Sequence, residues 1–542
     1  MNEKKILSYG LEAKLGTLNP HKYYSYTGTI TAQIVRMCGA RLYVKLPNED
    51  YTSFVQMGQV AEGNPIQVDK EGKVWRIKIS QDYKWSDGSK LCIEDVLYTF
   101  KELFDPAMEN TKACNIMHGY ISILNAESYY NGNAKWEDVG IKIVDQNYLE
   151  ITTEEPQTVA DVMLHFANTA STLVKKDIYE KAKVNGMSYG TSVEEYVSGG
   201  LFSIYEWKDG EYIKLKKNNY FPYSDLAKVD EIHILLSVSK QKQQKLFEEG
   251  KLDFVELISE NIQEFESYNN ILEDPQKIIT SINLNLKNPS CPALKNLNFR
   301  NAIYYALNRE KIAESVNEIP VQYYISTNRI IDNLKGIRYR DTDEAAENVV
   351  PNYGYNVELA KEYFSKALKE LDKEKIDIEL LCGDNQRHKT LSCEIKTSIE
   401  NTFGRDKITI HIKEIEYSKL KKYLTTWKTD KEAYQMAFAG FAGSTVAPWN
   451  ALKYHTGFYN GETWQNDQFD VLWHEANYGE SILIKGKRLQ LTAEMEAILI
   501  DQKPFIPVTQ EVYRYLISDR IKVMFNHPVP TIGFGWEYSD IK

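Results

Sequence analysis

The amino-acid sequence predicts an α/β protein whose 542 residues divide into two or three lobes. With 43% hydrophobic residues, the chain can bury a large core, and its length exceeds what one core usually serves. Strand patterns with a two-residue period are followed by helical spacing, once in residues 74–104 and again in residues 360–412. In the second stretch helices and strands alternate, which predicts a largely parallel sheet.

Residues 74–104 give the clearest local pattern. Apolar and polar residues alternate in the segment VWRIKI (74–79), which predicts a strand with one solvent-exposed face. The segment SDG (86–88) predicts a turn. Helical spacing follows in residues 93–104, and Asp95 falls in the first turn, where a carboxylate interacts favourably with the helix dipole.

Further elements follow from the same two periods. Residues 139–145 and 149–156 both alternate and predict a two-stranded unit. In the second half of the chain, helical and strand patterns succeed one another at residues 360–368, 376–381, 391–403 and 408–412.

Charge and hydropathy exclude several classes of protein. The net charge of -11 is spread along the chain without a long single-sign block, whereas a nucleic-acid groove requires a concentrated basic face. The sequence has no run of about 18 apolar residues, so it predicts no membrane-spanning helix. Residues 1–5 are charged but no apolar run follows them, so they predict no signal peptide.

The reactive residue types show no catalytic or metal-binding spacing. No GxSxG, HExxH or GxxxxGK[ST] motif occurs, and residues 474–478 (HEANY) lack the second histidine of a zinc-binding helix. The cysteines form no CxxC pair, so we expect no metal, no cofactor and mostly free, buried thiols. A disulfide between Cys382 and Cys393 is left open. An enzyme with an unfamiliar active site, for example an extracellular peptidase, is the rival class.

A series of motifs extends over nearly the whole chain. In order, they are TLNPHK (17–22), VWRIKI with KWSDG (74–88), VGIKIVD with LEITTEEP (139–156), GGLF (199–202), NFRNAIYYALNRE (298–310) and FIPV (505–508). The series resembles the signature of the extracytoplasmic oligopeptide-binding proteins of ABC importers, which form solute-binding protein family 5. Asn19 replaces the family's usual aspartate, and Leu201 and Phe202 replace a Pro-Tyr pair.

The resemblance implies a two-lobed α/β fold of the periplasmic-binding-protein type, with a hinge and an extra subdomain in the first lobe. It assigns the first lobe to residues 1–44, 170–281 and 506–542, the extra subdomain to residues 45–169, and the second lobe to residues 282–505.

The resemblance also implies a function without catalysis. Such a protein is expected to be a monomer that captures peptides between two closing lobes and delivers them to an ABC permease, whose separate ATPase subunits hydrolyse ATP. Its expected location is extracytoplasmic, in the periplasm or at the cell surface through a lipid anchor missing from this chain. A peptide-sensing receptor on the same fold is an alternative.

Residues 437–449 (AFAGFAGSTVAPW) resemble the family's strand and loop that pair with the peptide backbone. Small residues let a ligand chain approach closely, which suits Gly440. The resemblance assigns ligand contacts here to Phe438, Gly440, Phe441, Ala442, Gly443, Ser444 and Thr445.

Ser444 stands where the family carries an aspartate for the α-ammonium group of the peptide. A buried ammonium group without a countercharge is costly, and serine offers only a neutral acceptor. Three explanations stay open. The ligand is a peptide held by another carboxylate or by backbone groups alone, a peptide-like molecule without a free amine, or a non-peptide solute such as a metal chelate, a sugar or an opine-like compound.

Two other segments are expected to contact the ligand. Residues 384–389 (DNQRHK) follow a predicted strand as a loop leading into a helix, and ligands of α/β sheets bind at such strand ends. Because the family has a histidine in a similar context, His388 with Arg387 is a candidate for holding the ligand's carboxylate; a solvated helix start is the alternative. In an N-terminal loop, the resemblance assigns contacts to Tyr26, Thr27 and Gly28.

Overall fold

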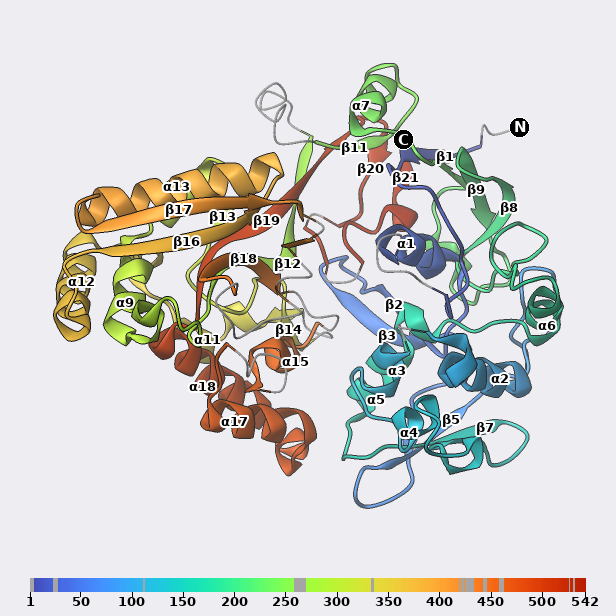
Figure 1. Ribbon diagram of the computed structural model, residues 1–542. Coiled ribbons are helices and arrows are strands. Elements are labelled where there is room, and N and C mark those ends of the chain that lie inside the picture. The colour runs from blue at the N-terminus through green and yellow to red at the C-terminus, as the bar shows by residue number, and fades with distance from the viewer. Residues whose placement is uncertain are drawn as a thin grey trace. The chain divides into compact units, whose positions relative to one another are not determined.

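A computed structural model of the chain forms two compact units (Figure 1). Unit 1 comprises Met1–Glu273, Asn333–Gly336 and Arg514–Lys542, and unit 2 comprises Asp274–Asp332 and Ile337–Tyr513. The structure describes residues 4–22, 28–110, 113–257, 270–332, 336–417, 419–420, 424, 433–441, 446–457, 463–525, 527–529 and 532–542.

The chain passes between the units inside two long strands. β12 (Ile271–Leu284) begins in unit 1 and continues into unit 2. β19 (Phe505–Ile517) begins in unit 2 and ends in unit 1. The finer division into lobes and an extra subdomain that the resemblance implies stays a prediction.

In the described part of unit 1, strands form two four-stranded sheets. The first has the order β1 (Ile6–Gly10), β10 (Glu231–Leu235), β9 (Tyr212–Lys217) and β8 (Phe202–Lys208), and the second has the order β4 (Ile66–Gln67), β5 (Val74–Lys78), β7 (Tyr148–Thr152) and β6 (Ile141–Ile143). β1 and β10 are parallel, and the other neighbours in both sheets are antiparallel. The antiparallel pair β6 and β7 confirms the predicted two-stranded unit.

The predicted strand, turn and helix of residues 74–104 are confirmed. β5 buries Trp75 and Ile77, the apolar residues of its alternating pattern. The helix α2 (Ile93–Phe104) begins directly after Cys92, whose backbone N–H donates to the Asp95 carboxylate at 3.3 Å. Asp95 therefore caps the helix and adds a negative charge near its N-terminus.

Helices surround these sheets in unit 1, with α2 against β6 and β7 of the second sheet (Figure 1). The described helices other than α2 are α1 (Gly28–Cys38), α3 (Cys114–Met117), α4 (Ala126–Tyr130), α5 (Val159–Phe166), α6 (Lys176–Val184) and α7 (Lys240–Glu248). One buried cluster joins Phe100 and Phe104 of α2 to Trp75 of β5 and Leu149 of β7, so α2 packs on the second sheet. A hairpin of β2 (Tyr43–Pro47) and β3 (Phe54–Gly58) contributes to the same unit.

A further described sheet has the order β11 (Phe254–Glu256), β19, β12, β18 (Met436–Phe441), β16 (Ile376–Gly383) and β17 (Ile408–Ile415), and β13 (Ile319–Pro320) pairs with β19. Of these strands, β13, β16, β17 and β18 lie wholly in unit 2. β16 is parallel to β17 and to β18, but β12 is antiparallel to β18 and β13 is antiparallel to β19. The prediction of a largely parallel sheet is therefore wrong outside β16, β17 and β18. The alternating pattern reports only the local strand–helix–strand unit of β16 and β17, and it carries no information on the distant partner β12.

Helices flank this sheet in unit 2 (Figure 1). The longer ones that the structure describes are α9 (Leu297–Ala306), α12 (Val357–Leu371), α13 (Gln386–Phe403), α17 (Asp467–Tyr478) and α18 (Lys487–Gln502). The predictions of α12, β16 and β17 are confirmed. α13 begins at Gln386, earlier than the predicted residue 391, because the Asn385 side chain caps it by accepting the His388 N–H at 2.8 Å.

The cysteines are all free, and Cys382 forms no disulfide with Cys393. Cys38, Cys291 and Cys382 are buried, but Cys92, Cys114 and Cys393 are exposed. The prediction of mostly buried thiols is therefore wrong for half of them. Cys92, for example, stands at the N-terminus of α2, where the chain is still near the surface.

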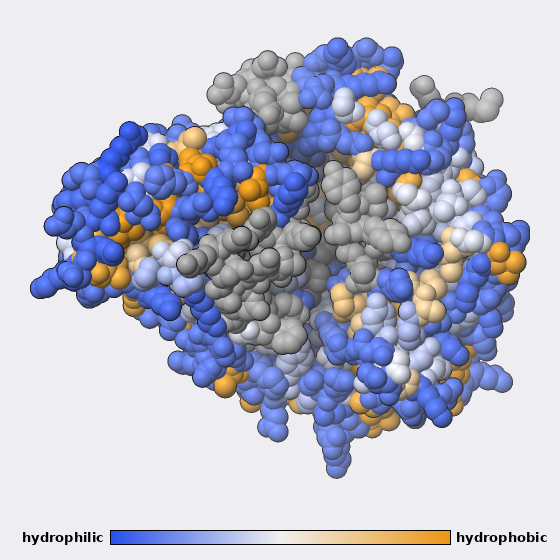
Figure 2. Space-filling view, in the orientation of Figure 1, coloured by the Kyte–Doolittle hydropathy of each residue, from blue (hydrophilic) through white to orange (hydrophobic). Residues whose placement is uncertain are grey.

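Figure 2 shows mainly hydrophilic side chains on the viewed face of each unit, with small apolar areas between them. The large apolar side chains gather inside the units, for example Trp75 in unit 1 and Phe299 in unit 2. Among the described residues, no helix combines the length and the apolar character needed to cross a membrane.

Candidate functional site

The structure describes five of the predicted ligand contacts. His388, Phe438, Gly440 and Phe441 lie in unit 2, and Gly28 is the first residue of α1 in unit 1. The other predicted contacts lie outside the described residues, namely Tyr26, Thr27, Ala442, Gly443, Ser444 and Thr445.

β18 is paired along its full length on one side only. Toward β12, the antiparallel register joins every residue of β18, from Met436 to Phe441. Toward β16, the parallel register joins only Met436 and Ala437. Within the described part of the chain, residues 438–441 therefore have no strand partner on the β16 side.

The backbone of Gly440 points toward this unpaired side. In a strand, the N–H and C=O groups of one residue point to the same neighbour, and those of the next residue point to the opposite one. The Asn285 N–H donates to the Gln435 carbonyl at 2.9 Å, so Gln435 and every second residue after it point toward β12. Phe438 and Gly440 belong to the other series, and Gly440 lies beyond the last residue paired with β16.

Gly440 carries no side chain beside this open edge. Gly440 is exposed, although it lies in a strand of the central sheet. A Cβ atom at this position would lie 2.5 Å from the Cγ2 atom of Ile278, so a larger residue would have to displace that side chain. Glycine inside a strand is typical of a place where another backbone approaches closely.

His388 lies beside the same edge, with its ring against that of Phe438 at a centroid distance of 5.2 Å. Its Nδ1 accepts the Gly383 N–H at 3.1 Å, so in the neutral ring Nε2 carries the proton. Burial, and then the charge of Arg387, lower the pKa of His388 to about 4. Near pH 7 His388 is therefore neutral, and it can offer a ligand an N–H donor but no positive charge.

Three charged residues, which we call the Arg387 cluster, lie next to this edge: Arg387, Glu318 and Glu511. Arg387 binds Glu318 through two contacts, Nε to Oε1 at 2.5 Å and Nη2 to Oε2 at 2.9 Å. Its Nη1 is 3.4 Å from Oε1 of Glu511. Nη2 also donates to Oγ1 of Thr280 at 2.8 Å. Because Thr280 is the register partner of Gly440, the cluster lies against the strand position next to the open edge.

The end of α10 (Arg309–Glu314) positions Glu318. The Asn317 N–H donates to the Glu314 carbonyl at 3.2 Å, and the Glu318 N–H donates to the Ala313 carbonyl at 2.9 Å. These are the two bonds of a Schellman turn, whose left-handed residue here is Asn317 with a φ of 55°. The turn ends the helix and directs the chain into β13, and the Glu318 side chain contacts Arg387.

The Arg387 cluster sets one positive charge against two carboxylates. Burial opposes the charge of Arg387, but Glu318 and then Glu511 hold its pKa above the usual value. Burial raises the pKa of Glu511, and Arg387 offsets this only in part. The side chains of Arg387 and Glu511 are 27% and 22% exposed, whereas Glu318 is buried. Glu318 thus engages the guanidinium group, which argues against the predicted role of Arg387 in holding a ligand carboxylate.

The sequence matches the family model of bacterial extracellular solute-binding proteins, family 5 (middle region), over residues 56–462. The chain belongs to this family. Among its relatives, the oligopeptide-binding protein OppA of Bacillus subtilis (strain 168) is 25% identical over 471 residues, or 83% of this chain and 79% of that one. The dipeptide-binding protein DppE of the same organism is 24% identical over 478 residues, or 86% and 82% of the two chains.

Solved structures of similar proteins share the fold of this family 5 protein. The substrate-binding domain of an oligopeptide ABC transporter from Bacillus anthracis str. Ames has a TM-score of 0.71 at 21% identity, with 100% of both chains covered. OppA of Listeria monocytogenes bound to peptide has a TM-score of 0.70 at 19% identity, also with 100% of both chains covered. These similarities confirm the predicted α/β fold of the periplasmic-binding-protein type.

Sequence reasoning missed three polar residues beside the open edge of this solute-binding protein: Thr280, Glu318 and Glu511. Each belongs to a different segment of the chain, and neither carboxylate lies in a motif of the family resemblance. The only member of the cluster that the sequence indicates is Arg387, as a candidate together with His388 for holding a ligand carboxylate. The pairing of β12 with β18 and of β13 with β19 brings the segments together.

Proposed function

We propose that this protein is an extracytoplasmic solute-binding protein that captures peptides as an added strand along β18 and delivers them to an ABC permease. The observation that carries the proposal is the open side of β18, where the Gly440 N–H and C=O groups point away from β12. The relatives are named as oligopeptide- and dipeptide-binding proteins, which supports a peptide as the ligand.

A backbone edge suits a ligand of variable sequence. Main-chain hydrogen bonds are the same for every peptide, so they provide affinity without selecting side chains. Ordered water can fill the remaining space around different side chains at little cost. ATP hydrolysis belongs to separate transporter subunits in this proposal, and the protein itself performs no catalysis. Its attachment to the cell surface through a lipid anchor is part of the same proposal.

The first experiment identifies the ligand without assuming its class. The purified protein is denatured, and the small molecules that it releases are measured by mass spectrometry. A ladder of short peptides is the expected result. A single defined non-peptide mass, such as that of a sugar or a metal chelate, would contradict the peptide proposal.

The second experiment tests the added-strand geometry from the ligand side. A released peptide is resynthesised with one backbone amide at a time N-methylated, which removes a single donor. Since a hydrogen bond contributes about 0.5–1.5 kcal/mol, methylation at a position facing β18 is expected to weaken binding by roughly 2- to 10-fold. Methylation at the adjacent position, which faces away, is the matched control. Equal losses at both kinds of position in isothermal calorimetry would exclude pairing along one edge.

A further inference from the structure

We propose that the Arg387 cluster is a subsite for a positively charged group of the ligand, an ammonium or a guanidinium. This inference rests on the proposed function, because it places that group beside a peptide bound along β18. The subsite is formed by Glu511 and Glu318, with Arg387 and Thr280 fixing the position of the carboxylates.

The first argument is the charge balance within the cluster. Glu318 forms both short contacts with the guanidinium group of Arg387, at 2.5 and 2.9 Å. Glu511 has one contact with it, at 3.4 Å, which is long for a charged hydrogen bond. One cation therefore serves two carboxylates, and the negative charge of Glu511 is only partly compensated. A ligand cation would supply the missing countercharge.

The second argument is the access to this charge from the open edge. Thr280 and Gly440 are register partners on neighbouring strands, so a side chain at either position points to the same face of the sheet. Arg387 reaches Thr280 on that face, at 2.8 Å. Gly440 is exposed, and the Ile278 side chain, whose Cγ2 lies 2.5 Å from where a Cβ of Gly440 would be, is the group that borders it on this face. Because the Glu511 side chain is itself partly exposed, a ligand strand along β18 can extend a charged group past Ile278 toward the cluster.

The third argument is that the neighbouring donor is neutral. His388 follows Arg387 in the chain, and its ring lies against Phe438 of β18. Its Nδ1 is occupied by the Gly383 N–H, so the ring adds no positive charge that would repel a ligand cation. The charges that contact one another at this edge are those of Arg387, Glu318 and Glu511.

The test compares peptide libraries on the wild-type protein. One degenerate pentapeptide library has free amino termini, a second is N-acetylated, and a third has free termini but omits lysine and arginine. If the ligand cation is the α-ammonium group, acetylation is expected to lower retention about 10- to 100-fold, the effect of losing a charged hydrogen bond. If the ligand cation is a side chain, the library without lysine and arginine is expected to show this loss of retention.

The variants Glu511→Gln and Glu414→Gln assign the effect to the cluster. Glu511→Gln removes one charge and keeps nearly the same shape. Its retention of the cationic library is expected to exceed its retention of the library without the cation by less than about 3-fold. Glu414 lies on β17 of the same unit, 2.9 Å from Lys389, and serves as the matched control whose substitution leaves the preference unchanged. Glu511→Asp keeps the charge, so this variant is expected to retain part of the preference for the cationic library.

The outcomes separate the subsite from the peptide-binding function. Equal retention of all three libraries by the wild-type protein would overturn the cation subsite and leave peptide binding intact. A preference that survives in Glu511→Gln would likewise overturn the assignment to this cluster. If the wild-type protein retains none of the libraries, both the proposed function and the subsite are wrong. The comparison on the wild-type protein does not depend on the folding of any variant.

Discussion

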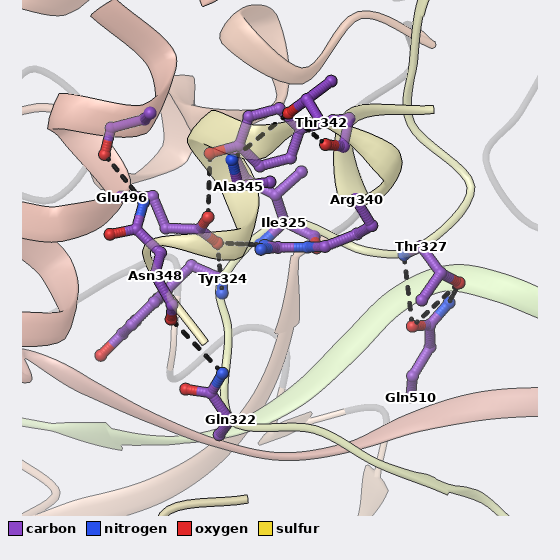
Figure 3. A network of polar contacts seen from close by, with 12 residues as sticks. Gln322, Tyr324, Ile325, Thr327, Arg340, Thr342, Ala345, Asn348, Glu496 and Gln510 are labelled. Atoms are coloured by element: carbon purple, nitrogen blue, oxygen red, sulfur yellow. Dashed lines mark hydrogen bonds and ion pairs between the residues drawn. The ribbon is translucent and has the colours of Figure 1, made fainter. Parts of the chain in front are cut away.

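Two ion clusters in unit 2 differ in how completely their carboxylates are used. In the first, Arg340 pairs with Glu496 of α18, whose side chain is 0% exposed (Figure 3). Oε1 of Glu496 accepts the Tyr324 and Ile325 N–H groups at 3.0 and 3.1 Å as well as Nη2 of Arg340, and Oε2 accepts the Tyr339 hydroxyl at 3.0 Å. One cation balances one carboxylate, and both carboxylate oxygens are occupied.

The Arg387 cluster has the opposite balance. Its two carboxylates, Glu318 and Glu511, share one cation, and Glu511 is partly exposed. A saturated, buried carboxylate such as Glu496 can only hold the chain that surrounds it. A partly exposed carboxylate whose negative charge is only partly balanced can still form an ion pair with a ligand. The comparison therefore separates a group that stabilises the fold from a group available for recognition.

The largest expected effect follows from breaking the saturated cluster with Glu496→Gln. This variant leaves Arg340 buried without a countercharge, which is expected to lower the free energy of unfolding by about 3–5 kcal/mol. The amides of Tyr324 and Ile325 lose an ionised acceptor, so their hydrogen exchange is expected to accelerate. Thermal unfolding and exchange measured by mass spectrometry check the two expectations.

Two further variants sharpen this prediction. Glu358 is an exposed residue of α12, and Glu358→Gln is expected to change the free energy of unfolding by less than about 0.5 kcal/mol. Glu511→Gln is expected to cost far less stability than Glu496→Gln, because a carboxylate with surplus charge is not essential to the fold. If Glu496→Gln and Glu511→Gln unfold at the same temperature, the distinction between the two clusters fails.

A smaller effect is expected from acid, which acts on the histidine bordering the open cluster. The pKa of His388 is lowered from 6.5 to about 4. Between these values the unfolded chain binds the proton and the folded ring does not, so the free energy of unfolding falls as the pH falls from 6.5 to about 4. The contribution of this group is about 3 kcal/mol.

The variant His388→Asn isolates this contribution. Asparagine keeps an acceptor for the Gly383 N–H but does not titrate, so the loss of stability between pH 7 and 4 is expected to shrink by the amount due to the ring. Denaturation curves at several pH values measure it. His411→Asn, at an exposed position on β17, is the control. Identical pH profiles for wild type and His388→Asn would show that burial does not perturb this ring.

The elements confirmed from the sequence are those that a local pattern specifies. β5 alternates along its own length, and α2 carries its apolar stripe together with its capping residue Asp95. β16 and β17 are joined by a single helix, so their parallel pairing follows from adjacent segments. The antiparallel pairing of β12 with β18 joins residues about 150 positions apart, and no period within either strand reports it.

The residues of the candidate site also fall into those that a local motif indicates and those that only tertiary contacts bring together. Gly440 and Phe438 were found because they lie in one motif of the family resemblance, and the structure places them on β18. The charge of the neighbouring cluster was not predictable, since Glu318, Arg387 and Glu511 meet only through tertiary contacts. The neutral state of His388 was equally hidden, because it depends on burial and on the Gly383 N–H.

The smallest expected effect comes from Thr280→Val, which changes the geometry of the open cluster without changing its charge. Valine cannot accept the Nη2 hydrogen that Thr280 accepts at 2.8 Å, so Arg387 is freer to turn toward Glu511. Closer pairing would compensate Glu511 and lower the preference for cationic peptides by about 2- to 5-fold, or less than about 1 kcal/mol. Thr280→Ser keeps the acceptor and is expected to behave as wild type in the same library competition. Equal preferences in the valine and serine variants would mean that Thr280 does not hold Arg387 away from Glu511, and the surplus charge would then have to be explained by Glu318 alone.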